Sequence, residues 1–192
     1  MPQQTAYFPP AHAYSLNKKR HANNTFYVVS IKKLIALLMI TFGFYTIYWS
    51  YKNWSVVKQH NPKYAQCNPL VRAIFSFFYL PVLFNCIQNK AKQEKVRMSF
   101  SAWHLAAACI LLSISAVALI SSGVFYLTWL GVLSAVCALL PIVKMQKVIN
   151  YTEHDPTGWA NHKFTSFNWL CVVAGASYTS LFALATFMLI AT

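Results

Sequence analysis

Long runs of apolar residues, separated by short polar connections that carry lysine and arginine, dominate the pattern along this chain. A helix rises 1.5 Å per residue and needs about 20 residues to cross a hydrocarbon layer about 30 Å thick. Five runs approach that length, at residues 34–51, 70–87, 102–121, 123–143 and 168–190. Unpaired backbone polar groups are costly in hydrocarbon, so such runs must be helices or parts of helices. The pattern predicts an all-α, polytopic integral membrane helix bundle with five apolar segments.

The last three runs have the character of core transmembrane helices. The third and fourth are joined at Ser121-Ser122-Gly123 without a charge from 102 to 143, which predicts a tight antiparallel hairpin. Small residues let helix backbones approach closely in lipid, and in each run they recur at the spacing of a left-handed helix seam. We therefore expect three core helices that contact one another through these stripes: Ala106, Cys109, Ser113 and Ala116; Thr128, Gly131, Ala135 and Ala138; Ala176, Thr179, Ala183 and Thr186.

The first two runs are short segments that either cross the membrane or re-enter it, with Gly43 and Pro81 as candidate break points. Basic residues favour the cytoplasmic side. With the N-terminus inside, five full crossings place most of the basic residues in the cytoplasm. If both short runs return instead, all 16 are cytoplasmic. Both versions put the 121–123 turn and the C-terminus outside, and the charges favour full crossings of both runs or return of both.

Composition supports a membrane location. Hydrophobic residues make up 57% of the chain and charged residues 10%, well below the roughly one quarter that is usual for soluble domains. The net charge of +13 reflects only three acidic residues, Glu94, Glu153 and Asp155. Because the lysines and arginines flank apolar runs, they suit anionic lipid headgroups better than nucleic acid. We expect a multi-pass protein of the cell (inner) membrane with lipid partners and no nucleic-acid partner.

Residues 1–25, with the cluster Lys18-Lys19-Arg20 and several prolines, are expected to form a flexible basic arm. Residues 26–192 are expected to form a single helical membrane domain, with the first run as an uncleaved anchor rather than a signal peptide. The five cysteines are widely spaced and form no metal-binding motif. We expect them to act as small apolar residues, with no metal and no cofactor.

An aromatic and basic motif occupies the end of the first run: Thr41, Gly43, Tyr45, Tyr48, Trp49, Lys52 and Trp54. Tyr45, Tyr48, Trp49 and Lys52 share one helical face, and Tyr and Trp favour the headgroup level of a membrane. We interpret the motif as an interfacial aromatic belt; the alternative is a cation–π cage for a lipid or ligand headgroup. The pattern T-x-G-x-Y-x-x-Y-W resembles that of uncharacterised bacterial multi-pass inner-membrane protein families. The resemblance implies a bacterial cytoplasmic membrane but supplies no activity.

A polar loop follows the fourth run and contains Glu153, His154, Asp155 and His162. These residue types are those of a metal site or an acid–base pair. Asp155-Pro156-Thr157-Gly158 is also an ordinary turn sequence, which is the interpretation that we favour.

The chain has no carboxylate within an apolar run, which disfavours ion-coupled transport, and it lacks the common nucleotide-hydrolase, esterase and zinc-protease motifs. These absences favour a non-enzymatic accessory, assembly or scaffolding protein that contacts lipid and partner membrane proteins or a second copy of itself. The alternative is a small-solute permease or channel. A membrane-bound enzyme that uses the 153–162 loop ranks third.

Overall fold

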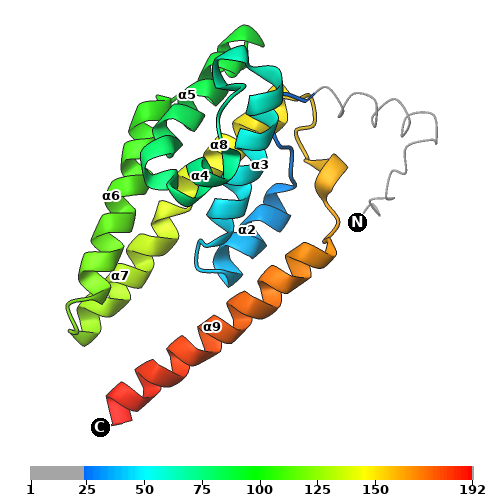
Figure 1. The fold of residues 1–192 in the computed structure, drawn as a ribbon. Coiled ribbons are helices and arrows are strands. Elements are labelled where there is room, and N and C mark those ends of the chain that lie inside the picture. The colour runs from blue at the N-terminus through cyan, green and yellow to red at the C-terminus, as the bar shows by residue number, and fades with distance from the viewer. Residues whose placement is uncertain (1–23, 192) are drawn as a thin grey trace, which may run out of the picture.

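All regular structure in residues 24–191, the part of the chain that the computed structural model describes, is helical (Figure 1). The expected arm at residues 1–25 lies almost wholly outside this part. The elements are α2 (Ile31–Ile40), α3 (Tyr45–His60), η1 (Pro62–Tyr64), α4 (Pro69–Ile74), α5 (Ser76–Gln93), α6 (Ala102–Ile120), α7 (Phe125–Ala138), α8 (Leu140–Thr152), η2 (Trp159–Asn161) and α9 (Ser166–Ala191).

Neither of the first two apolar runs forms one continuous helix. The first is broken between α2 and α3, where Phe42 and Gly43 have φ angles of 48° and 85°. The second is broken at Phe75, between α4 and α5. The expected break at Pro81 is wrong, because this proline lies inside α5. A break at Gly43 is confirmed, since glycine adopts the left-handed conformation at low cost.

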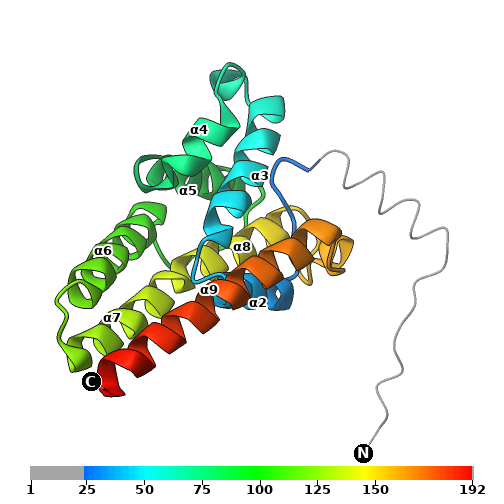
Figure 2. The same ribbon diagram turned by 60° about the horizontal axis from the view of Figure 1, so that its bottom comes forward.

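The predicted antiparallel hairpin is present as α6 and α7, which lie side by side in both Figure 1 and Figure 2. A Cβ atom added to Gly131 would lie 2.9 Å from the carbonyl oxygen of Ala116. The hydroxyl oxygens of Ser115 and Ser134 are 2.7 Å apart across the same interface. Leu130, the neighbour of Gly131, is 51% exposed. The contact through Gly131 is therefore as close as the small-residue pattern indicates.

Two helical stretches are long and apolar enough to cross a membrane within the described residues, Ala102–Ile120 and Phe125–Thr152. The first is α6, and the second combines α7 with α8. This finding supports membrane association.

The expected three-helix core of α6, α7 and α9 is wrong. α9 packs mainly on α2, and it stands apart from the α6–α7 hairpin in Figure 1. The contact uses Gly175, whose added Cβ would lie 2.5 Å from the carbonyl oxygen of Ile40. Of the stripe expected on α9, Ala176 is exposed and Thr179 is half-buried, while the side chains of Ala183 and Thr186 are not described. Close helix contact in α9 therefore uses a position one residue from the expected stripe.

The buried core lies where four helices contact one another. Its largest fully buried side chains come from α2, α3, α5 and α8: Trp49, Trp54, Tyr45, Phe84, Leu34, Leu37, Leu38, Leu83, Ile87, Ile142, Met145 and Ile149. Residues 26–29, which we call the N-terminal strap, add Phe26, Val28 and Val29 to this core.

Candidate functional site

The motif at the end of the first run builds the turn between α2 and α3. The hydroxyl of Thr41 donates to the carbonyl oxygen of Leu37 at 2.7 Å and accepts from the backbone N–H of Tyr45 at 3.0 Å. The N–H of Gly43 donates to the carbonyl oxygen of Leu38 at 2.8 Å. The Thr and Gly of the pattern therefore connect one helix end to the next helix start and satisfy backbone groups there.

The aromatic residues of the motif are mostly buried rather than interfacial. Tyr45, Trp49 and Trp54 are 2%, 0% and 0% exposed. The indole N–H of Trp49 donates to Gln146 Oε1 at 2.6 Å, across to α8. An interfacial belt is therefore wrong for these three side chains, because the helical face that the sequence identifies is covered by α5 and α8 as well as by α9. The sequence identifies this helical face but does not show which other helices cover it.

Tyr48 and Lys52 are half-buried and lie at the edge of this core. The ring of Tyr48 stacks on Phe167 of α9 with a centroid distance of 4.6 Å. The ammonium of Lys52 lies 5.6 Å from the ring centroid of Tyr27 in the N-terminal strap. The motif thus joins α3 to α9 and to the strap.

Buried amide side chains that the sequence analysis missed hold the strap in place. Gln146 Nε2 donates to the carbonyl oxygen of Tyr27 at 3.1 Å, and Asn150 Nδ2 donates to that of Val29 at 3.0 Å. Asn53 Oδ1 accepts from the N–H of Tyr27 at 3.2 Å. Burial raises the pKa of the Tyr27 hydroxyl, which accepts from Asn161. The signal available in the sequence was the pair of amides one helical turn apart, Gln146 and Asn150.

Replacement of Asn150 by alanine is expected to destabilise the fold by about 1–3 kcal/mol, because it leaves the buried carbonyl of Val29 without a donor. The same change at Tyr151, which is exposed on the same helix, serves as the control. Thermal unfolding followed by helical circular dichroism in mild detergent measures both. Equal midpoints for the two variants would contradict a structural role for the amide.

A cation–π cluster exists, but its cation belongs to the chain. The guanidinium of Arg72 lies 4.3 Å from the ring centroid of Trp54 and 5.0 Å from those of Tyr64 and Tyr79. Burial raises the pKa of Tyr64 to about 12. These contacts attach α4 to α3 and α5, so the aromatic faces are already occupied at this point.

The carboxylates of the 153–162 loop are hydrogen-bonded within the fold. Glu153 accepts from the backbone N–H of Thr25 at 3.1 Å and from its hydroxyl at 2.6 Å. Asp155 accepts from the N–H groups of Trp159 and Ala160 at 3.0 and 2.9 Å. Asp155 therefore makes the contacts of a turn-forming residue.

The two histidines of that loop have different partners. His162 stacks on Trp159 at a centroid distance of 4.2 Å, while His154 Nε2 lies 3.9 Å from a carboxylate oxygen of Glu94. Within residues 24–191 no three His, Cys, Asp or Glu side chains are arranged to hold a metal ion.

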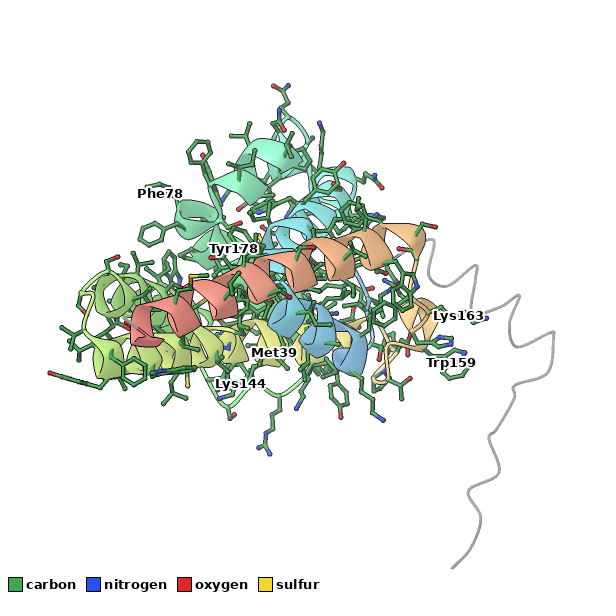
Figure 3. The ribbon with its side chains drawn as sticks, turned by 90° about the horizontal axis from the view of Figure 1, so that it is seen from below. Met39, Phe78, Lys144, Trp159, Lys163 and Tyr178 are labelled. Atoms are coloured by element: carbon green, nitrogen blue, oxygen red, sulfur yellow. The ribbon has the colours of Figure 1, made fainter. Side chains whose placement is uncertain are left out.

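Segments from distant parts of the sequence meet at one end of the molecule, where Lys33, Asn161 and Lys163 lie. We call it the basic end. Lys33 Nζ donates to Asn161 Oδ1 at 2.8 Å and to the carbonyl oxygen of Lys163 at 2.7 Å. Burial lowers the pKa of Lys33. In Figure 3 the labelled Trp159 and Lys163 lie at the opposite end of the molecule from the α6–α7 turn.

An open apolar groove of about 470 Å³ lies between α3 and α9. Its lining includes Tyr45, Tyr48 and Tyr51 on one side and Cys171 and Tyr178 on the other. Tyr178, which is labelled in Figure 3, also contacts the α2–α3 turn, with its ring centroid 5.8 Å from that of Phe42. The groove suits an apolar group, because its lining contains tyrosines and one cysteine but no carboxylate, histidine, lysine or arginine.

Comparison of the chain with known protein families, curated proteins and solved structures finds no match. The function must therefore be argued from the geometry of this molecule.

Proposed function

We propose that this chain is a non-enzymatic integral membrane protein that acts as an accessory, assembly or scaffolding subunit through contacts with lipid and with other membrane proteins. The observation that carries the proposal is the division of the surface. Helices α6, α7 and α9 contain no lysine, arginine, aspartate or glutamate. The same three helices expose large apolar side chains, including Leu111, Val117, Leu133, Leu181 and Met188. Such a surface is unfavourable in water and suits hydrocarbon.

The arrangement of the loops supports the version in which both short runs return. His60, at the end of α3, lines a small cavity together with Asn24, Ala160 and Asn161. Five full crossings would place His60 and Asn161 on opposite sides of the membrane. We therefore infer that α2–α3 and α4–α5 re-enter and return, and that α6, the α7–α8 stretch and α9 cross.

Re-entrant backbone needs shielding from lipid. The turn between α2 and α3 makes its own hydrogen bonds, and Gly43 approaches a side-chain carbon of Leu139, which lies between α7 and α8. If the basic end lies on the cytoplasmic side of the inner membrane, this arrangement also agrees with the bias of basic residues towards that side.

Single cysteines introduced as His60→Cys, His154→Cys and Ser122→Cys in a cysteine-free background test the topology. An impermeant thiol reagent should label the cysteine at position 122 in intact cells and the other two only after lysis. Labelling at position 60 in intact cells would restore five crossings. Labelling at position 154 in intact cells would contradict both versions.

The accessory role has its own test. The protein is purified in lipid nanodiscs, and bound proteins and lipids are identified by mass spectrometry. A stoichiometric membrane-protein partner is expected. A monomer without a partner that conducts solute in liposomes would overturn the accessory role and favour a permease.

A further inference from the structure

A second cavity, different in character from the aromatic groove, lies at the basic end between α3, η1 and α5. Its volume is about 420 Å³. We call it the polar pocket and define it by His60, Lys63, Asn85, Asn89, Lys90 and Gln93. None of these residues contributes to the strap network or to the proposed crossing helices.

The α5 wall presents a row of amides. Asn85, Asn89 and Gln93 follow one another at four-residue intervals and so share one face of the helix. Asn85 is half-buried and Asn89 and Gln93 are exposed, and none of the three side chains makes a hydrogen bond with another described residue. Amide groups that have no partner within the protein can donate to a bound ligand.

The opposite wall adds positive charge and further donors. Lys63 of η1 and His60 of α3 line it, and Lys90 lies on α5 between Asn89 and Gln93. The Nδ1 atom of His60 lies 3.0 Å from the carbonyl oxygen of Val56, so its N–H is already used within α3 and the ammonium of Lys63 is the main donor of this wall. Lysine ammonium groups are strong ligands of phosphate oxygens, and amide N–H groups complement them.

The carboxylates nearest to this pocket have other partners. Glu94 pairs with Lys90 at 2.8 Å, and this ammonium holds the pKa of the Glu94 carboxyl below its ordinary value. Glu153 is hydrogen-bonded to Thr25. A bound anion would share the Lys90 ammonium with Glu94, but it would bind the Lys63 ammonium without a competing carboxylate. The pocket therefore favours an anion over a cation.

We infer that the polar pocket binds a phosphate-bearing group, supplied by a membrane lipid headgroup or by a soluble phosphate ester. The soluble source is independent of the proposed membrane function, whereas the lipid source rests on it. The basic end is where lipid headgroups would lie if the basic loops are cytoplasmic.

Cys86 also lines the pocket and provides a readout. The other four cysteines, Cys67, Cys109, Cys137 and Cys171, are replaced by alanine. The rate at which a thiol reagent modifies Cys86 is then measured in dodecyl maltoside micelles, which contain no phosphate. The probes are glycerol 3-phosphate in solution and phosphatidic acid incorporated into the micelles.

Two double variants with equal loss of charge separate the pocket from the general positive field. Lys63→Gln with Lys90→Gln removes both pocket ammonium groups. Lys58→Gln with Lys92→Gln removes two exposed lysines from the same helical region that do not line the pocket. Each charged hydrogen bond lost should weaken binding about tenfold or more. A milder variant, Asn89→Leu, tests the amide wall if the pocket double variant does not fold.

Protection of Cys86 by glycerol 3-phosphate identifies a soluble phosphate ester, and protection by phosphatidic acid alone identifies a lipid headgroup. Either result supports the inference if the pocket variants lose protection and the Lys58/Lys92 variant keeps it. The absence of protection with both probes, or equal loss in both double variants, would overturn it. Neither outcome depends on the topology labelling, so the proposed membrane function fails or stands separately.

Discussion

Replacement of Gly131 by leucine is expected to separate α6 from α7 and to destabilise the protein by about 1–3 kcal/mol or more. The first side-chain carbon alone would lie 2.8 Å from Ile120 Cγ1 and 2.9 Å from the carbonyl oxygen of Ala116. Backbone atoms cannot move aside as a flexible side chain can, so the two helices must part. Leucine is a much better helix former than glycine, so local helix propensity predicts the opposite sign. Unfolding by heat or by a denaturing detergent, titrated against a mild one, measures the loss.

Ala118→Leu is the matched control for this variant, because it introduces leucine at an exposed position of α6 in the same hairpin. It should leave stability nearly unchanged. Truncation of Leu130 to alanine should also be mild, since that side chain is largely exposed. Similar stability of the Gly131 and Ala118 variants would contradict the close helix contact.

Replacement of Gly175 by leucine is expected to detach α9 from α2. An added Cβ would lie 2.5 Å from the carbonyl oxygen of Ile40 and 2.9 Å from its carbonyl carbon. Because α9 packs mainly on α2, this single contact has a large share in positioning the helix. The rate of proteolysis in the connection between α8 and α9, in detergent, should rise in the variant.

Ala176→Leu provides a direct contrast with Gly175→Leu. The small-residue stripe read from the sequence placed Ala176 in a helix interface, whereas the structure leaves it exposed. The Ala176 variant should therefore resist proteolysis as the parent protein does. Greater protease sensitivity in the Ala176 variant than in the Gly175 variant would restore the stripe as the contact face.

The α6–α7 hairpin could be predicted from the sequence because its determinants are local. A connection as short as 121–123 allows two apolar helices only one arrangement, and Gly131 marks the point of closest approach. The position of α9 had no such constraint. The seam spacing predicts that one face of the helix carries small residues. Ala, Ser and Thr are common in apolar runs, however, and they do not specify which helix packs against that face. Gly175 makes the contact because only glycine lacks the side-chain atom that would meet Ile40.

The motif at Thr41–Tyr45 shows a different limit. Gly43 could be identified as a break because a positive φ angle favours glycine. The burial of Trp49 and Trp54 could not be identified, since a face of aromatic and basic residues is equally compatible with lipid headgroups and with a protein core. Trp49 lies in the core because its indole N–H binds Gln146, which is 97 residues away in the chain. Long-range partners of this kind leave no local pattern.

The N-terminal strap has a consequence for the order in which this protein is completed during synthesis. Residues 26–29 leave the ribosome early, but the amides that bind their carbonyl groups are 119 and 121 residues further along the chain. Until α8 has been made, those carbonyl groups lack their final donors and the apolar side chains of Phe26 and Val29 lack part of their cover. Closure of the strap is therefore a late event, and nascent chains that stop before α8 should stay open to chaperones and proteases at their N-terminal end.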